Sequence, residues 1–273
     1  MSYLSRFNIR VTGEAHLPKV VFLHGLMGFL NNWGSVTRRL SSKYQCLVYD
    51  QRGHGKSMKP DSGYHPKDFA DDLHKILHEL QWNSVNLVGH SMGGRNALYF
   101  SYLYPGSLKS LVIEDIGPDG NPDNYVYYQN MLDAIPTPFR DKAAIQNFFE
   151  HTFASVFTTK EHPKTIIPFL MANLEEKEGG LYDWKFSKQA IIDSVKLGRS
   201  ENVWPLIEQI SVPTLYMRGE RSKDLEKSVY EHVLTKNSLI TGVEISDAGH
   251  WIHSDQPEVF TETLEGFLDR INY

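Results

Sequence analysis

The chain has 273 residues, 41% of them hydrophobic, and a formal net charge of −5 at pH 7. This length can bury a sizeable core, and one domain with an inserted subregion is the natural interpretation. Cys46 is the single cysteine, so no disulfide framework can form, and its apolar neighbours indicate a buried small side chain in a reducing, cytoplasmic compartment. Because the sequence has no long basic block, no long apolar run and no apolar segment near residue 1, we expect no nucleic-acid partner, no membrane span and no signal peptide.

Short apolar runs predict the strands, and helical patterns fall between most of them. The runs cover residues 7–11, 19–23, 45–49, 84–88, 108–113, 214–217 and 242–245. The clearest helical pattern covers residues 65–80, where Asp71, Asp72, Lys75 and Glu79 take the polar face, and a further amphipathic helix is predicted over 257–271. Strands that alternate with helices indicate an α/β fold with a mostly parallel sheet, covered by helices on both faces.

The alternation stops between residues 117 and 205, where the sequence is rich in Tyr, Phe and Pro. We therefore predict a helical cap over residues 118–205, inserted into a core made of residues 1–117 and 206–273. Aromatic side chains are common in this segment, and they fit either an apolar binding site or packing of the cap onto the core. They are Tyr125, Tyr127, Tyr128, Phe148, Phe149, Phe153, Phe157 and Trp184.

The segment Gly89-His90-Ser91-Met92-Gly93-Gly94 follows a predicted strand and precedes the helical run 96–104. A serine on a tight strand-to-helix turn needs a strained, left-handed backbone, and Gly89 and Gly93 leave room for it. The turn also opens a helix, whose free N–H groups favour negative charge. A chance match in a glycine-containing turn is the alternative, but the strand before and the helix after favour a nucleophile elbow.

Other motifs follow the ends of predicted strands, where functional loops of a parallel sheet lie. In chain order they are His24-Gly25-Leu26-Met27-Gly28, Asp50-Gln51-Arg52-Gly53-His54-Gly55, Glu114-Asp115-Ile116-Gly117-Pro118 and Asp247-Ala248-Gly249-His250-Trp251. Over nearly the whole chain this order resembles the α/β-hydrolase superfamily, and most closely its small intracellular acyl-esterases and acyl-thioesterases. The resemblance implies an eight-stranded-type sheet flanked by helices, a helical cap, and a Ser–acid–His relay.

Within that resemblance, Ser91 attacks an acyl carbonyl and His250 is the base. His253 is an alternative base, although its place at the start of the closing helix is more typical of a capping or solvent-facing residue. His74 and His78 stand four residues apart without a third ligand, so a solvated helix face is favoured over a metal site. We expect no metal and no cofactor. His24 and His90 flank the reactive loops and fit structural hydrogen-bonding roles there.

The resemblance also implies where the oxyanion is stabilised. The N–H of Met92 is one expected donor and the N–H of Leu26 is the other. Gly25 lets the chain approach the substrate, and we expect the Leu26 and Met27 side chains to line the acyl pocket. Trp251, next to His250, completes the expected substrate-binding residues.

The acid of the relay is less straightforward. Many relatives carry it three residues after a glycine that ends the penultimate strand, but Gly219-Glu220-Arg221-Ser222 puts a serine there. The matched esterase group has it after the strand that follows the elbow helix, where Asp115 stands. Glu114 should point to the opposite side of the strand. Glu220 and Asp224 remain the alternatives.

These residues favour a serine hydrolase without cofactor, which cleaves small-molecule carboxylic esters or thioesters through an acyl-enzyme. A C–C bond hydrolase or a perhydrolase can use the same triad, and a weakly catalytic small-molecule binding protein can keep it. The physiological substrate, the acyl chain length and the oligomeric state do not follow from the sequence.

Overall fold

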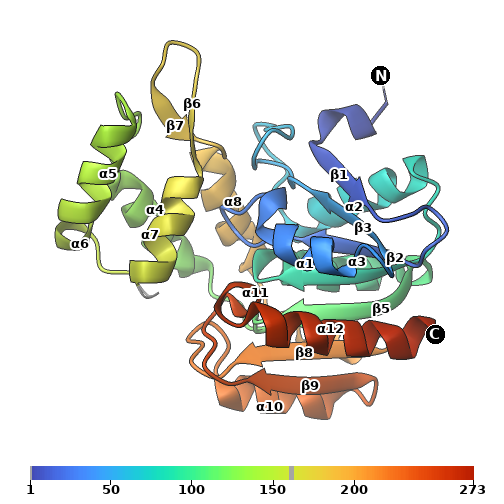
Figure 1. The fold of residues 1–273 in the computed structure, drawn as a ribbon. Coiled ribbons are helices and arrows are strands. Elements are labelled where there is room, and N and C mark those ends of the chain that lie inside the picture. The colour runs from blue at the N-terminus through green and yellow to red at the C-terminus, as the bar shows by residue number, and fades with distance from the viewer. Residues whose placement is uncertain (1, 160–162) are drawn as a thin grey trace.

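A 7-stranded sheet forms the centre of the protein, with the strand order β1-β3-β2-β4-β5-β8-β9 (Figure 1). The computed structural model describes residues 2–159 and 163–273. The strands are β1 (Ile9–Thr12), β2 (Lys19–Leu23), β3 (Gln45–Tyr49), β4 (Val85–His90), β5 (Leu108–Glu114), β8 (Thr214–Gly219) and β9 (Ile240–Ile245). β1 is antiparallel to β3, and the other neighbouring strands are parallel. The mostly parallel sheet is thus confirmed, with seven strands in the described residues where an eight-stranded type was expected.

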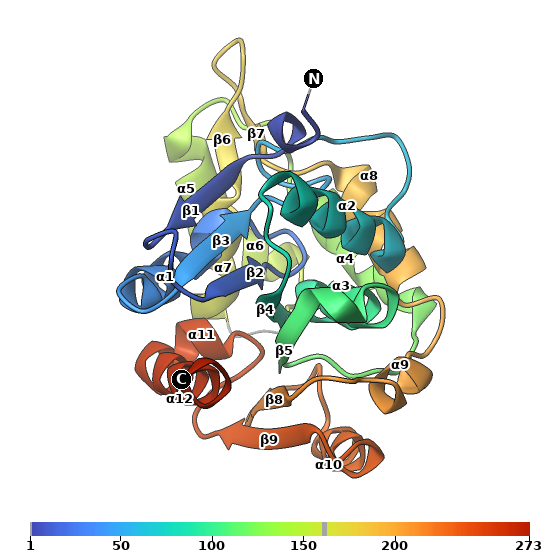
Figure 2. The same cartoon turned by 90° about the vertical axis from the view of Figure 1, so that its right-hand side faces the viewer.

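Helices cover both faces of this sheet, as Figure 2 shows. One face carries α2 (Pro66–Glu79), α3 (Met92–Leu103), α9 (Trp204–Glu208) and α10 (Lys227–Lys236), and the other carries α1 (Gly34–Leu40), α11 (Ile252–Asp255) and α12 (Pro257–Asn272). Alternate residues of one strand serve the two faces: in β2, Val21 packs into the first core and Val20 and Phe22 into the second. Burial on both sides explains why the strands read as continuous apolar runs.

Helix α2 illustrates how local sequence sets an element. Pro66 stands at its first turn, and the Asp68 carboxylate accepts a hydrogen bond from the His65 N–H at 2.9 Å. These signals place the helix within one residue of the predicted range at each end. Asp72 departs from the prediction, because its carboxylate is buried and pairs with Arg52 instead of facing solvent.

Short 3-10 helices lie before β1 and in the connections between these elements. They are η1 (Leu4–Arg6), η2 (Leu30–Trp33), η3 (Pro105–Ser107) and η4 (Pro122–Asn124). Among the described residues, no helix combines the length and the apolar character that crossing a membrane requires.

Most of the segment between β5 and β8 lies beyond the end of the sheet to which its parallel strands point (Figure 1), whereas its last helix, α9, packs on one face of the sheet. It contains α4 (Tyr125–Ala134), α5 (Lys142–His151), α6 (Phe153–Val156), α7 (Pro163–Ala172), α8 (Lys188–Gly198) and a hairpin of β6 (Leu174–Glu176) with β7 (Tyr182–Trp184). We propose that residues 118–205 form the cap and that 1–117 with 206–273 form the core. The short hairpin was not predicted, because three-residue strands show too little alternation to read.

Candidate active site

Ser91 stands in the turn between β4 and α3, with φ at 52° and ψ at −116°. A Cβ atom on Gly89 would lie 2.4 Å from the Gly93 carbonyl oxygen, and one on Gly93 would lie 2.4 Å from the Leu23 carbonyl oxygen. Both positions therefore require glycine, as the motif predicted. The Ser91 N–H donates to the Glu114 carbonyl at 2.9 Å, which ties the strained turn to β5.

Three loops bring Ser91, His250 and Asp115 together. The Nε2 atom of His250 lies 2.9 Å from the Ser91 hydroxyl oxygen, and its Nδ1 atom lies 2.8 Å from Oδ2 of Asp115. Ser91 follows β4, Asp115 follows β5 and His250 follows β9, so all three lie at the carboxyl ends of parallel strands. A hydroxyl, an imidazole and a carboxylate in this order can pass a proton from the serine to the histidine.

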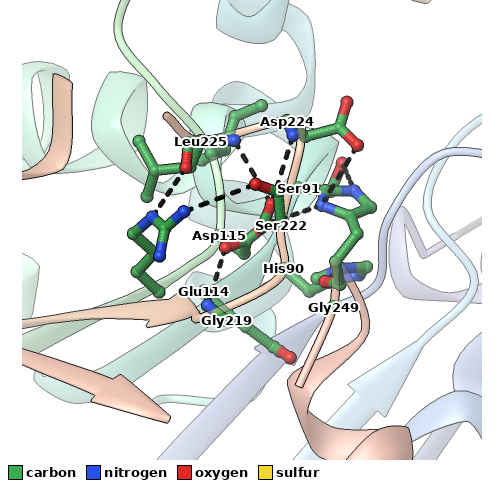
Figure 3. Close-up of polar contacts among 12 residues, drawn as sticks. His90, Ser91, Glu114, Asp115, Gly219, Ser222, Asp224, Leu225 and Gly249 are labelled. Carbon is green, nitrogen blue, oxygen red and sulfur yellow. Dashed lines mark hydrogen bonds and ion pairs between the residues drawn. The ribbon is translucent and has the colours of Figure 1, made fainter. Parts of the chain in front are cut away.

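Asp115 is held from several sides (Figure 3). Its Oδ1 atom accepts the Gly219 N–H at 3.0 Å, and its Oδ2 atom accepts the hydroxyl of Ser222. Burial raises the pKa of Asp115 above its ordinary value, while the hydrogen bonds from His250, Ser222 and Gly219 oppose that rise. Ser222 occupies the place where many relatives carry the acid, and here it supports an acid that comes from the neighbouring strand.

The other candidate acids lie differently. The Oδ2 atom of Asp224 is 3.7 Å from Nδ1 of His250, beyond hydrogen-bond distance. Glu220 is exposed, and its carboxylate accepts the Asp247 N–H at 3.0 Å. Glu114 points away from His250 and pairs with His253. Asp115 is therefore the carboxylate with the direct hydrogen bond to the imidazole.

His253 is buried, so the expectation that it caps a helix or faces solvent is wrong. Its Nδ1 atom lies 2.8 and 2.9 Å from the two carboxylate oxygens of Glu114, and its N–H donates to the same group at 2.9 Å. Burial raises the pKa of Glu114, but the charge and the hydrogen bonds of His253 outweigh it and hold that pKa below its ordinary value. The pairing could not be read from the sequence, because the two residues lie far apart in the chain.

His90, Glu114 and His253 place their possible ligand atoms within 4.8 Å of one another, which makes them a candidate metal group among the described residues. Each of the three already has a protein partner: Nε2 of His90 contacts the His250 carbonyl oxygen at 2.9 Å, and the Glu114 carboxylate pairs with Nδ1 of His253. His74 stacks on Tyr104 and does not belong to this group. That no metal is needed stays a prediction.

Leu26 and Met92, whose N–H groups are the expected oxyanion donors, line one cavity together with Ser91. Met92 is the first residue of α3, so its N–H has no acceptor within the helix. A Cβ atom on Gly25 would lie 3.4 Å from the Cβ of Ser91, so this loop lies close to the serine, and its approach to a substrate stays a prediction.

Two buried histidines shape the loop that carries Leu26. Nε2 of His24 accepts the Gln51 N–H at 3.0 Å, which confirms a structural role for His24. Nε2 of His54 accepts the Met27 N–H at 3.2 Å, a contact that the sequence did not reveal. Burial lowers the pKa of His54 to about 3, so its ring is neutral at pH 7 and able to accept. Met27 itself adopts a positive φ of 58°.

Ser91 borders two small chambers of about 40 Å³ each. The first, which we name the α3 chamber, is lined by residues that include Leu26, Ser91, Met92, Arg95, Ser194 and Arg199. The second, the His250 chamber, is lined by residues that include Met27, Ser91, Tyr127, Tyr128, His250 and Trp251. Leu26 lines both chambers. A larger cleft of about 400 Å³ lies next to them and shares Leu26 and Trp251 with the His250 chamber.

The aromatic side chains of residues 118–205 serve both purposes that the sequence left open. Tyr127 and Tyr128 line the His250 chamber. Phe149, Phe153 and Trp184 are buried in a hydrophobic cluster of this segment, with Phe148 and Phe157 packed against it. Tyr128 serves both purposes, because it lines the chamber and also packs against this cluster.

Comparisons with known proteins agree with this geometry. The chain is 29% identical to the sn-1-specific diacylglycerol lipase of Mus musculus over 94% of this chain and 82% of the relative. It is 24% identical to the 2-(acetamidomethylene)succinate hydrolase of Mesorhizobium japonicum over 97% of this chain and 93% of the relative. The solved structure of a marine microorganism esterase superimposes with a TM-score of 0.83 at 28% identity, covering 96% of this chain and 99% of that one.

A family model described as alpha/beta hydrolase fold matches residues 18–257, which is most of the chain. Strands β2 to β9 and the loops that carry Ser91, Asp115 and His250 fall within that match. The protein belongs to the alpha/beta hydrolase fold family.

Proposed function

We propose that this protein is a serine hydrolase that cleaves carboxylic esters through an acyl-enzyme intermediate. The observation that carries the proposal is the chain of hydrogen bonds from Ser91 to His250 at 2.9 Å and from His250 to Asp115 at 2.8 Å. Two of the similar proteins are named a lipase and an esterase, which supports an ester as the substrate. The hydrolase of a succinate derivative indicates that acyl compounds differ among relatives.

In the proposed reaction, the Ser91 hydroxyl oxygen attacks the carbonyl carbon while His250 takes its proton. The N–H groups of Leu26 and Met92 stabilise the negative charge on the carbonyl oxygen. His250 then protonates the leaving group, and an acyl group stays on Ser91. A water molecule, deprotonated by His250, releases the acid and restores the hydroxyl. Asp115 stabilises the imidazolium that forms in both halves.

This proton transfer indicates which part of the substrate occupies each chamber. The leaving group takes its proton from Nε2 of His250, so it occupies the His250 chamber. The α3 chamber is lined by Ser91 but not by His250, so we place the acyl group there. On this assignment Leu26 contacts both parts of the substrate, and Met27 and Trp251 contact the leaving group. The sequence had led us to expect Met27 in the acyl pocket. This assignment places it at the leaving group instead.

We also propose that the protein cleaves thioesters and that it is located in the cytoplasm. Thioester cleavage rests on the resemblance of the loops at Gly25, Asp115 and His250 to those of acyl-thioesterases. Location in the cytoplasm rests on the single buried cysteine, Cys46.

The test is steady-state hydrolysis of p-nitrophenyl and coenzyme A esters of increasing acyl length, by the natural protein and by Ser91→Ala. We expect turnover with some of these esters and its loss in Ser91→Ala, with the circular dichroism spectrum unchanged. Equal rates for the two proteins would contradict the proposal, and no turnover of any ester would favour a binding protein.

EDTA should leave the rate of ester hydrolysis unchanged, and a loss of activity that zinc reverses would contradict a metal-independent reaction.

A further inference from the structure

The α3 chamber has a buried positive charge in its wall. Arg95 is four residues after Ser91 on the elbow helix, which puts it about 6 Å along the helix axis from the serine. Its side chain is 3% exposed and lines the chamber together with Arg199. Burial lowers the pKa of Arg95 to about 10, so the guanidinium still carries its charge at pH 7.

The partners of this guanidinium are backbone carbonyl oxygens. Nη1 donates to Gly117 at 3.1 Å and to Asp119 at 3.3 Å, and Nη2 donates to Pro118 at 3.3 Å and to Glu201 at 2.6 Å. Nε is buried and has no hydrogen-bond partner in residues 2–159 and 163–273. Within the same residues, no carboxylate oxygen lies within the 4.0 Å ion-pair distance of Arg95. The carboxylates of Asp119 and Glu201 instead accept hydrogen bonds from Trp204 and Tyr99.

Two other buried arginines in the described part of the chain have carboxylate partners. Arg52 binds both carboxylate oxygens of Asp72, at 2.6 and 2.5 Å, and Arg218 binds Glu244 at 2.7 Å. Burying a charge without a counter-ion is costly, and the fold avoids that cost at these two sites. Arg95 has no such carboxylate partner among the described residues, and it lines the same chamber as the proposed nucleophile.

A second polar group in the chamber points to the same kind of ligand. The hydroxyl of Ser194, on α8, is buried and has no hydrogen-bond partner among the described residues. Buried polar groups in folded proteins are almost always satisfied, so an unsatisfied donor beside an unpaired cation suggests that an acceptor binds there. A carboxylate supplies both the negative charge and the acceptor oxygens.

We infer that the α3 chamber binds a carboxylate on the acyl group, and that the substrate is a half-ester of a short dicarboxylic acid. The free carboxylate meets Arg95 and Ser194 while Ser91 attacks the esterified carboxyl group. The chamber of about 40 Å³ has room for roughly three water molecules, which limits the acyl chain to a few carbon atoms. This inference rests on the proposed function and names the substrate class of the same site.

The test compares monoethyl succinate with ethyl succinamate, in which a neutral amide replaces the free carboxylate at nearly the same size. Ethanol is the leaving group of both, and proton release or ethanol formation gives kcat/KM. We expect the natural protein to prefer monoethyl succinate by at least about tenfold. Arg95→Met should lower kcat/KM for monoethyl succinate by roughly 10- to 100-fold and that for ethyl succinamate much less, because a hydrogen bond to a charged group is lost.

Controls separate charge recognition from a structural role. Lys196→Met removes the same charge from an exposed position on α8, where the ammonium lies over the ring of Tyr125, and it should leave the preference unchanged. Ser194→Ala, which breaks no hydrogen bond of the fold, should reduce the preference several-fold even if Arg95→Met does not fold.

Two results would overturn the inference: equal kcat/KM of the natural protein for the two esters, or an equal loss for both esters in Arg95→Met. The first of these would leave the proposed function intact, provided that p-nitrophenyl acetate is hydrolysed. Failure to hydrolyse any ester would instead refute the proposed function.

Discussion

At the scale of single residues, strain is concentrated around Ser91. Ser91, Asp115 and Met27 all adopt positive φ, at 52°, 52° and 58°. Such backbone conformations cost of order 1–3 kcal/mol each and persist only where neighbours enforce them. The Ser91 N–H is bonded to Glu114, the Asp115 N–H to Met217 and the Met27 N–H to His54. The three residues are therefore fixed before a substrate arrives.

Asp115 should be the acid on which the proposed relay depends. Asp115→Asn keeps the size of the side chain but removes the charge that stabilises an imidazolium, so kcat should fall by roughly 10³- to 10⁴-fold. Asp224→Asn is the matched control, because its carboxylate lies 3.7 Å from the same nitrogen, and it should change kcat only slightly. The reverse ranking in steady-state kinetics would place the acid after β8 and withdraw the role of Asp115.

Residue roles could be predicted where a local motif carries them, as for Ser91 and the glycines beside it. The role of Asp115 depended on the resemblance, since Ser222 occupies the more common place of the acid. The contacts of His253 with Glu114 and of Met27 with His54 were not predicted. These contacts join distant parts of the chain, and no local pattern records which buried donor meets which acceptor.

At the scale of elements, the accuracy of prediction follows burial. Strands β2 and β3 have the predicted bounds, because both are buried on two faces and read as uninterrupted apolar runs. β9 starts two residues before the predicted strand, since the exposed Thr241 separates Ile240 from the apolar run that was read. α3 begins at Met92 because the turn at Ser91 leads directly into the helix, whereas the apolar pattern begins only at residue 96.

The turn between β4 and α3 should not tolerate a side chain at position 93. In Gly93→Ala the added methyl group would meet the Leu23 backbone at 2.4 Å, and backbone atoms cannot move aside cheaply. We expect a loss of several kcal/mol in the free energy of unfolding, at the upper end of what single substitutions cost. Gly106→Ala is the control, because nothing lies within 4 Å of the added atom. Urea unfolding of both variants measures the difference, and equal midpoints would contradict the steric argument.

At the scale of the whole molecule, buried histidines connect the loops at the carboxyl end of the sheet. His24, His54 and His90 are all buried, and burial lowers the pKa of each, to about 3 for His54 and His90. The unfolded chain takes up protons on these side chains near pH 6.5. In the folded protein His54 and His90 do not take them up until about pH 3, and burial also holds the pKa of His24 below its ordinary value. Stability is therefore complete above pH 6.5 and falls as the pH drops toward 3.

The free energy of unfolding should accordingly fall by on the order of 2 kcal/mol for each of His54 and His90 between pH 6.5 and pH 5. His54→Gln, whose amide oxygen can accept the Met27 N–H, should make this dependence less steep. Urea unfolding at several pH values tests the prediction. Equal slopes for the variant and the natural protein would show that His54 does not contribute.

The central claim is that Ser91 carries the acyl group during turnover, and trapping that intermediate tests it most directly. The protein would be mixed rapidly with p-nitrophenyl acetate, quenched in acid, digested and examined by mass spectrometry. We predict that the peptide containing Ser91 gains the mass of one acetyl group, and that Ser91→Ala shows neither this adduct nor turnover. An acetyl group on another residue, or hydrolysis that continues in Ser91→Ala, would contradict the account.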